Sequence, residues 1–145
     1  MRIHELGHIV LYVTDLERSA NFYRDTLGFH EIHHEHGMAV FSSGRTHHEL
    51  LLIEIGGSVR PPHAPEPGLY HIGFKIGNST QELHQALQEL LQKNIPLIGT
   101  ADHTVTHSLY ILDPDGNELE LYADVSDIWK NDASALMKPA RPLPF

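Results

Sequence analysis

An internal repeat is the feature that most constrains the fold of this chain. The stretch Gly7–Asp15 resembles Tyr70–Asn78, and each carries a histidine, His8 or His71, before a run of alternating apolar residues. This alternation is typical of a β-strand. Because a repeat within a chain of 145 residues indicates repeated structural units, the sequence predicts two similar modules.

A helical pattern follows each of the two repeated strands. In the first half it begins after Asp15, a plausible N-cap, and is expected to stop at Gly28. In the second half Ser79 and Glu82 have the spacing of a capping box, and Asn94 and Pro96 are expected to end the helix. Each half therefore reads as a strand followed by a helix.

Three strand-like runs follow each helical stretch, separated by residues typical of turns. These runs are Phe29–His34, Met38–Ser42 and Glu49–Ile55 in the first half, and Leu97–Thr100, Ser108–Leu112 and Glu118–Tyr122 in the second. The order predicts an α+β fold of two paired βαβββ modules in a single domain over residues 1–145. Module 1 is expected at about 3–57 and module 2 at about 69–123.

Two proline-rich segments lie outside these modules. Residues 58–68 contain four prolines, which disfavour a helix or a central strand and predict an extended crossover linker. The tail, 124–145, is expected to form a short helix at about 126–137 and then an extended end. Its large apolar side chains predict docking on either its own domain or a partner subunit: Trp129, Leu136, Met137 and Phe145.

Composition excludes several classes of function. Ten Lys and Arg against nineteen Asp and Glu give a net charge of −9, which argues against a nucleic-acid partner. The absence of cysteine excludes disulfides and zinc–thiolate sites. The sequence shows neither a membrane-length apolar run nor a secretory signal. We therefore expect a cytoplasmic protein with no membrane contact.

Histidine is unusually frequent, with 13 residues, and it is the commonest metal ligand. The equivalent positions of His8 and His71 favour a shared metal site. A carboxylate is available in the last strand-like run, where alternation places Glu118, Glu120 and Tyr122 on one face. Two imidazoles and one carboxylate form the facial triad of non-heme Fe(II) oxygenases, although spacing alone does not choose between Glu118 and Glu120.

Together these segments resemble the vicinal oxygen chelate superfamily of glyoxalase, bleomycin-resistance and extradiol-dioxygenase proteins. The resemblance covers about residues 3–124 and rests on Gly7–Leu16, Phe22–Phe29, His71–Phe74 and Asp113–Tyr122. It implies that the two modules form an open, mixed-sheet barrel around a metal site. It also selects Glu120 as the carboxylate, so that His8, His71 and Glu120 are the implied ligands.

Within that superfamily the chain looks most similar to single-domain type I extradiol dioxygenases. This resemblance implies catalytic roles for His48, Tyr110 and His103, with His47 as the alternative to His48. The implied reaction inserts O₂ into a catechol-type substrate, a small aromatic diol. Fe(II) is the expected metal, with Mn(II), Ni(II) and Zn(II) as alternatives. Many extradiol enzymes carry two such double modules, so a homodimer or the tail would complete the pocket here.

Two alternatives remain at this point. A glyoxalase-like isomerase, lyase or transferase would use a fourth protein ligand, for which Glu54 is the candidate. A metal-free drug-sequestering protein would fit the acidic composition. Such proteins generally lack the metal triad, whereas this chain carries all three residue types.

Overall fold

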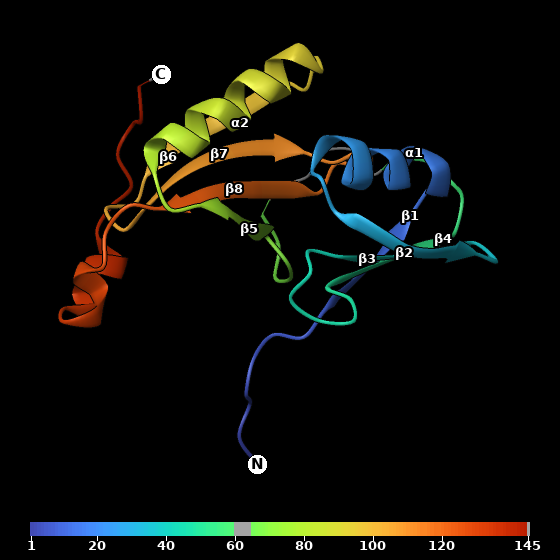
Figure 1. Cartoon of the computed structure of the whole chain (residues 1–145), viewed down its shortest axis with the longest axis horizontal. Helices are drawn as coiled ribbons and strands as arrows, with labels where there is room; N and C mark the ends of the chain where they lie inside the picture. Colours follow the sequence, from blue (N-terminus) through green and yellow to red (C-terminus); the bar gives the residue numbers. More distant parts are fainter. Residues whose placement is uncertain (60–64, 145) are drawn as a thin grey trace. The chain divides into compact units, whose positions relative to one another are not determined.

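The structure of the chain is a computed structural model that describes residues 1–59 and 65–144. Two compact units divide the chain: Met1–Pro62 with Pro114–Gly116, and His63–Asp113 with Asn117–Phe145. Each unit follows the order strand, helix, three strands (Figure 1), which confirms the predicted βαβββ modules. The elements are β1 (Ile9–Val13), α1 (Leu16–Asn21), β2 (His30–Glu35), β3 (Met38–Ser42), β4 (Leu50–Glu54), β5 (His71–Gly77), α2 (Thr80–Gln92), β6 (Leu97–Asp102), β7 (Thr106–Leu112) and β8 (Glu118–Asp124).

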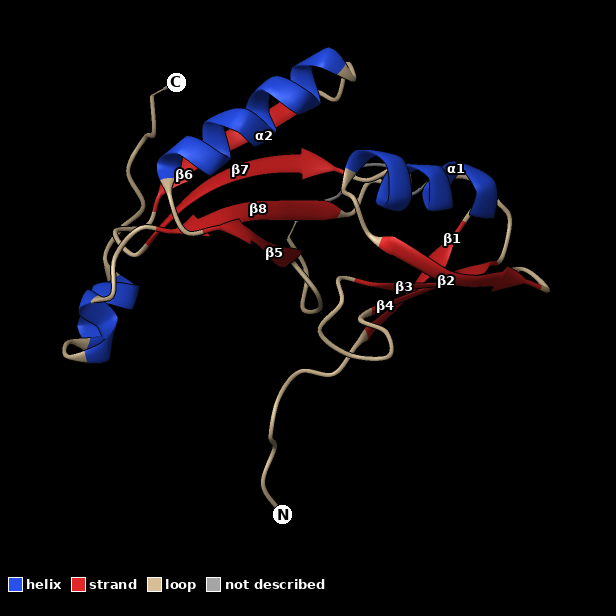
Figure 2. Ribbon diagram, in the orientation of Figure 1, coloured by secondary structure: helices blue, strands red, loops and turns tan. Residues whose placement is uncertain are grey.

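The first unit is an open four-stranded sheet of order β1-β4-β3-β2, with α1 on one face (Figure 2). β1 and β4 are parallel, whereas β3 is antiparallel to β4 and to β2. Alternate strand residues are buried with the apolar side of α1: Leu11, Val13, Phe41, Leu50 and Leu52. Burying each such side chain stabilises the unit by about 1.5–3 kcal/mol.

The beginning of α1 is fixed by two aspartates. Asp15 is the N-cap, and its side chain accepts a hydrogen bond from the Arg18 backbone N–H, as the sequence predicts. Asp115, from the turn segment that belongs to this unit, accepts hydrogen bonds from the Thr14 hydroxyl at 2.5 Å and the Ser19 hydroxyl at 3.2 Å. A carboxylate is favourable near a helix N-terminus. Asp115, in the turn Asp113-Pro114-Asp115-Gly116, therefore has a structural role at the beginning of α1.

The first helix departs from the predicted regular helix at Phe22. It continues as a π-helical turn, Phe22–Thr26, in which the Leu27 N–H donates to the Phe22 carbonyl. Phe22 and the adjacent Tyr23 are both buried, and their rings meet edge to face with centroids 5.3 Å apart. The wider turn accommodates two consecutive aromatic residues on the buried side. Gly28 ends the helix, as predicted, with a φ of 77°.

The second unit is an open four-stranded sheet of order β5-β8-β7-β6 with α2 on one face (Figures 1 and 2). Leu83, Leu87 and Leu90 of α2 are buried, together with Leu109, Ile111, Leu119 and Leu121 of the sheet. The capping box is confirmed, because the Glu82 N–H donates to Ser79 Oγ and Glu82 Oε2 accepts from the same hydroxyl. Both sheets have the mixed pairing that the sequence predicts.

The C-terminal segment differs from its prediction. Instead of one helix at 126–137, it forms two short 3-10 turns, Ile128–Lys130 and Ala133–Met137. Asp132 separates them because its side chain accepts from the Ser134 N–H and thereby caps a new turn. Trp129, Leu136 and Met137 are exposed in this chain, so docking of these side chains on a partner subunit stays a prediction, and Phe145 lies outside the described residues. The segment instead pairs with β6 through main-chain hydrogen bonds between Asp102 and Arg141.

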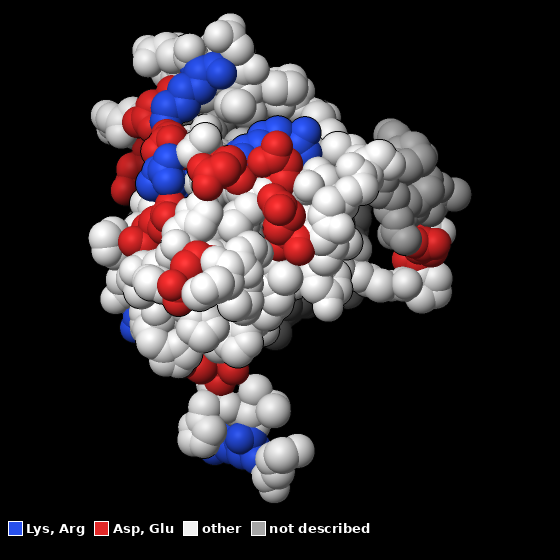
Figure 3. Space-filling view, turned by 90° about the vertical axis from the view of Figure 1, so that its right-hand side faces the viewer, with Lys and Arg blue, Asp and Glu red and all other residues white. Residues whose placement is uncertain are grey.

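The surface of the protein carries charges of both signs (Figure 3). On the face drawn in Figure 3, Lys and Arg side chains lie among Asp and Glu side chains. Arg24 pairs with Glu31 at 2.7 Å. Of the predicted crossover linker, 58–68, residues 60–64 lie outside the described part of the chain. Among the helices that the structure describes, none is long and apolar enough to cross a membrane.

Candidate metal and substrate site

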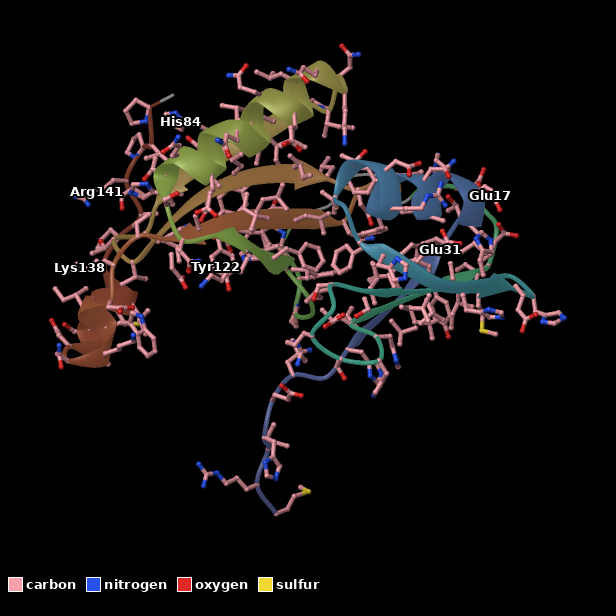
Figure 4. The ribbon with its side chains drawn as sticks, in the orientation of Figure 1. Glu17, Glu31, His84, Tyr122, Lys138 and Arg141 are labelled. Carbon is pink, nitrogen blue, oxygen red and sulfur yellow. The ribbon has the colours of Figure 1, made fainter. Side chains whose placement is uncertain are left out.

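Alternate side chains of strand β8 face the core on one side and the candidate site on the other. Leu119 and Leu121 are buried on the side that α2 covers, and Glu118, Glu120 and Tyr122 project to the opposite face. Figure 4 shows Tyr122 on the side of the sheet away from α2. The sequence pattern therefore predicts the facing of these carboxylates correctly.

Glu120 lies between residues of both neighbouring strands. In the sheet register it is opposite Tyr110 of β7 and beside Gly73 of β5. Its Oε2 lies 3.1 Å from His71 Nε2, and its Oε1 accepts a hydrogen bond of 2.6 Å from the Ser108 hydroxyl. The His71 imidazole and the Ser108 hydroxyl thus both contact the Glu120 carboxylate on the open face of the sheet.

Tyr110 extends this group toward the turn after β6. Its hydroxyl donates to Glu120 Oε1 at 3.2 Å and lies 2.8 Å from His103 Nε2. A carboxylate only accepts, so the single hydroxyl hydrogen is directed at Glu120 and the tyrosine oxygen accepts from His103 Nε2–H. Burial, followed by the charge of Glu120, raises the pKa of Tyr110 well above its usual range, so this hydroxyl stays protonated near neutral pH.

His71 has a second nitrogen without a hydrogen bond. Its Nδ1 is buried and makes no hydrogen bond to any described residue, and Glu118 Oε1 lies 3.7 Å from it, beyond hydrogen-bonding distance. The two carboxylates that spacing alone could not distinguish therefore take different places. Glu120 faces Nε2 and Glu118 lies on the Nδ1 side of the same ring.

In the first unit, His8 and His48 lie together. His8 precedes β1 and His48 precedes β4, and because these strands pair in parallel, the two rings come within 4.6 Å between centroids. His47 Nδ1 lies 2.6 Å from His48 Nδ1. Burial, followed by the charges of His47 and His8, lowers the pKa of His48, which favours its neutral form.

Glu54 does not have the surroundings expected of a fourth ligand. Its Oε2 accepts a hydrogen bond of 2.7 Å from the Leu16 N–H, at the beginning of α1. A carboxylate at this position compensates the free N–H groups of the first helical turn. Glu54 is therefore engaged in holding α1 on its sheet.

The structure brings the predicted site residues together in two groups, one in each unit. His71, Glu120, Tyr110 and His103 cluster in the second unit, and His8 and His48 meet in the first. Within residues 1–59 and 65–144, no three His, Asp or Glu side chains already form a metal cage. Sequence reasoning missed Ser108, although its position two residues before Tyr110 places both on the same face of β7.

Comparison with known proteins identifies the family. Residues 5–121 match the Glyoxalase/Bleomycin resistance protein/Dioxygenase superfamily. The chain belongs to this superfamily. A structure of a superfamily glyoxalase/dioxygenase from Nostoc punctiforme has the same fold, with a TM-score of 0.69 at 23% identity over 85% of this chain and 92% of that chain.

Two curated proteins of this superfamily are similar in sequence. Catechol-2,3-dioxygenase of Bacillus subtilis (strain 168) is 35% identical over 134 residues, which cover 90% of this chain and 46% of that protein. Biphenyl-2,3-diol 1,2-dioxygenase 3 of Rhodococcus globerulus is 33% identical over 120 residues, or 82% of this chain and 63% of that protein. The chain thus spans about half to two thirds of the length of these relatives.

The second unit offers donors that fit a divalent metal of the kind the superfamily binds. His71 Nε2 and Glu120 Oε2 are 3.1 Å apart, so both could contact one ion. A ligating histidine usually donates its other N–H to a carboxylate or carbonyl, and Glu118 lies on the side of the unsatisfied Nδ1. This orphaned nitrogen is therefore consistent with His71 as a ligand.

Proposed function

We propose that the chain is a metal-dependent extradiol dioxygenase, which cleaves the ring of a catechol-type substrate with O₂. His8, His71 and Glu120 are the proposed metal ligands, and His48, Tyr110 and His103 the proposed catalytic residues. The observation that carries the proposal is the cluster at Glu120, where one carboxylate oxygen faces an imidazole and the other accepts from Tyr110. The similarity to catechol and biphenyl-diol dioxygenases supports this reaction class.

When bound, the metal would bring the diol and O₂ together and accept charge from the substrate. Both oxygen atoms enter the ring-opened product, so the reaction needs no external reductant. The chain's own residues orient the substrate and move its protons. Tyr110, kept protonated by its raised pKa, would turn its hydroxyl hydrogen from Glu120 to the deprotonated substrate oxygen when the substrate is bound.

His48 is the proposed general base. Its lowered pKa keeps the ring neutral near pH 7, as a group that removes a proton from a substrate hydroxyl must be. His103, with Nε2–H directed at the Tyr110 oxygen, would fix the tyrosine hydroxyl by this hydrogen bond. These roles assign one group to proton removal and two groups to hydrogen bonding.

The proposal includes the native metal, the partners and the location. Fe(II) suits two imidazoles and one carboxylate, and Mn(II), Ni(II) and Zn(II) are the alternatives. The partners are a small aromatic diol, O₂ and, in a homodimer, a second copy of the chain. A cytoplasmic location agrees with the absence of cysteine.

Anaerobic loading with Fe(II), followed by a panel of catechols in air, tests the function. O₂ uptake and a yellow ring-opened product are expected, at one O₂ per product. His71→Ala and Glu120→Ala should abolish both signals. Glu35→Gln is the matched control, because Glu35 is an exposed carboxylate on β2 paired only with surface histidines in the described structure. Stoichiometric metal binding without turnover of any diol would contradict the dioxygenase proposal.

A further inference from the structure

The turn between β6 and β7 holds His103 in an unusual backbone environment. Thr104, the next residue, has a φ of 74°, in the left-handed region that β-branched residues disfavour. The His103 N–H donates to the Thr106 carbonyl at 2.9 Å, which closes the turn tightly. A conformation of this kind persists only where surrounding contacts impose it.

Asp102 supplies those contacts. Its Oδ1 accepts the Thr104 N–H at 2.7 Å, and its Oδ2 accepts from Arg141 Nη2 at 2.8 Å. The backbones of Asp102 and Arg141 also exchange two hydrogen bonds of 2.9 Å. One carboxylate therefore joins the strained residue to the C-terminal segment, and Figure 4 shows Lys138 and Arg141 on that segment.

Packing holds only one side of this turn. Val105 is buried, but on the Thr104 side there is a hollow of about 340 Å³, lined by Thr104, Lys138, Pro139 and Arg141. On that side the described contacts of Thr104 are its hydrogen bond to Asp102 and the turn closed by the His103 N–H and the Thr106 carbonyl.

We propose that Asp102 and Arg141 are positioning residues, which fix the β6–β7 turn so that His103 Nε2 reaches the Tyr110 hydroxyl. The observed result of this arrangement is the 2.8 Å contact between those two atoms. The C-terminal segment thereby becomes part of the support of the site through Arg141. The expected effect on turnover rests on the proposed function, whereas the expected effect on the position of His103 does not.

The geometric arm uses NMR of the histidine ring carbons in the full chain without added metal, with the His103 signal assigned from His103→Gln. Asp102→Ala should shift or broaden that signal. Adding Thr104→Gly should restore it, because glycine adopts a positive φ without an imposed contact. Lys130→Ala is the matched control, since it removes another ion pair of the same segment, Lys130–Asp127, away from the turn.

The kinetic arm measures catechol turnover of the Fe(II)-loaded variants. Asp102→Ala should lower kcat about tenfold or more, because misplacing a catalytic group costs rate, while KM changes by about twofold or less. Asp102→Ala with Thr104→Gly should recover most of kcat, which a general loss of stability would not allow. Arg141→Ala keeps the hydrogen bond between Asp102 and the Thr104 N–H, so it should lower kcat by a smaller factor. This variant replaces Asp102→Ala in the test if Asp102→Ala fails to fold.

The two arms separate this inference from the proposed function. A wild-type chain without turnover whose His103 signal responds as expected would reject the dioxygenase function and keep the positioning role. An active wild type whose His103 signal and kcat are unchanged in Asp102→Ala and Arg141→Ala would overturn the positioning role and keep the function.

Discussion

Tyr110 and Glu120 face each other across β7 and β8, and the Tyr110 hydroxyl donates to Glu120 Oε1 at 3.2 Å. Tyr110→Phe removes this donor without changing the shape of the ring. We expect kcat for a catechol to fall about 10²-fold, as for loss of one donor to a developing anion, with a smaller change in KM. Steady-state O₂ uptake measures both constants.

Ser108 is fully buried and holds the same carboxylate oxygen through a 2.6 Å hydrogen bond. In Ser108→Ala the Glu120 side chain loses this contact and can rotate away from His71. Because outer contacts of this kind orient metal ligands, we expect metal affinity to drop about 10–100-fold. Calorimetric titration with Mn(II) or Zn(II) measures this. Equal metal affinity in Ser108→Ala and wild type would show that the Ser108 hydrogen bond does not orient the carboxylate.

Glu118 is expected to orient His71 through Nδ1, from which it now lies 3.7 Å. Glu118→Gln keeps the size of the side chain and removes its charge. Metal affinity should fall about tenfold, less than for Glu120→Gln, because only the outer partner of the ligand is weakened. The same titration ranks the two variants. A larger loss in Glu118→Gln than in Glu120→Gln would reverse the assignment of ligand and partner.

Asp102 should make stability depend on pH in the acid range. The Thr104 N–H, and then the charge of Arg141, hold the pKa of Asp102 below its usual 3.8. The ionised Asp102 carboxylate therefore contributes its full stabilisation above pH 3.8, the pKa of the group in the unfolded chain. This contribution is lost as the pH falls through the lower pKa that Asp102 has in the folded chain. At pH 7, Asp102→Asn should lower the free energy of unfolding by about 1.5 kcal/mol. Urea unfolding from pH 7 to 3 should show this difference shrinking below about pH 4.

Gly77 has no room for a side chain. A Cβ there would lie 2.6–2.8 Å from three atoms of Glu82, the residue that completes the capping box of α2. Gly77→Ala should displace Glu82 and cost about 1 kcal/mol, the usual value of a lost cap. Gly99→Ala is the control, because its Cβ would make only ordinary contacts at 3.8 Å and beyond. Thermal denaturation of both variants gives the comparison.

Sequence alone predicts those features that depend on local periodicity and capping. The eight strands, the N-caps at Asp15 and Ser79, and the helix stop at Gly28 all follow from patterns within a few residues. The facing of Glu120 follows from strand alternation in the same way. The repeat pointed to His8 and His71, whereas family resemblance selected Glu120 and the catalytic residues, and all of these assignments stay predictions.

Features that depend on contacts distant in the sequence could not be predicted. The π-helical turn at Phe22 arises because two adjacent aromatic residues are both buried. The different places of Glu118 and Glu120 depend on the register of β8 with β5, which puts one carboxylate on each side of the His71 ring. The docking of the C-terminal segment uses backbone groups, whereas the sequence pointed to its apolar side chains.

The pairing of Arg141 with Asp102 has a consequence for self-association. β6 is an outer strand of its sheet, and such strands leave a row of unpaired N–H and C=O groups that another chain could extend. The Arg141 backbone occupies part of that row, and the Thr100 hydroxyl donates to the Leu143 carbonyl further along the same strand. The segment therefore acts as a short protective edge that opposes strand-to-strand aggregation of the protein.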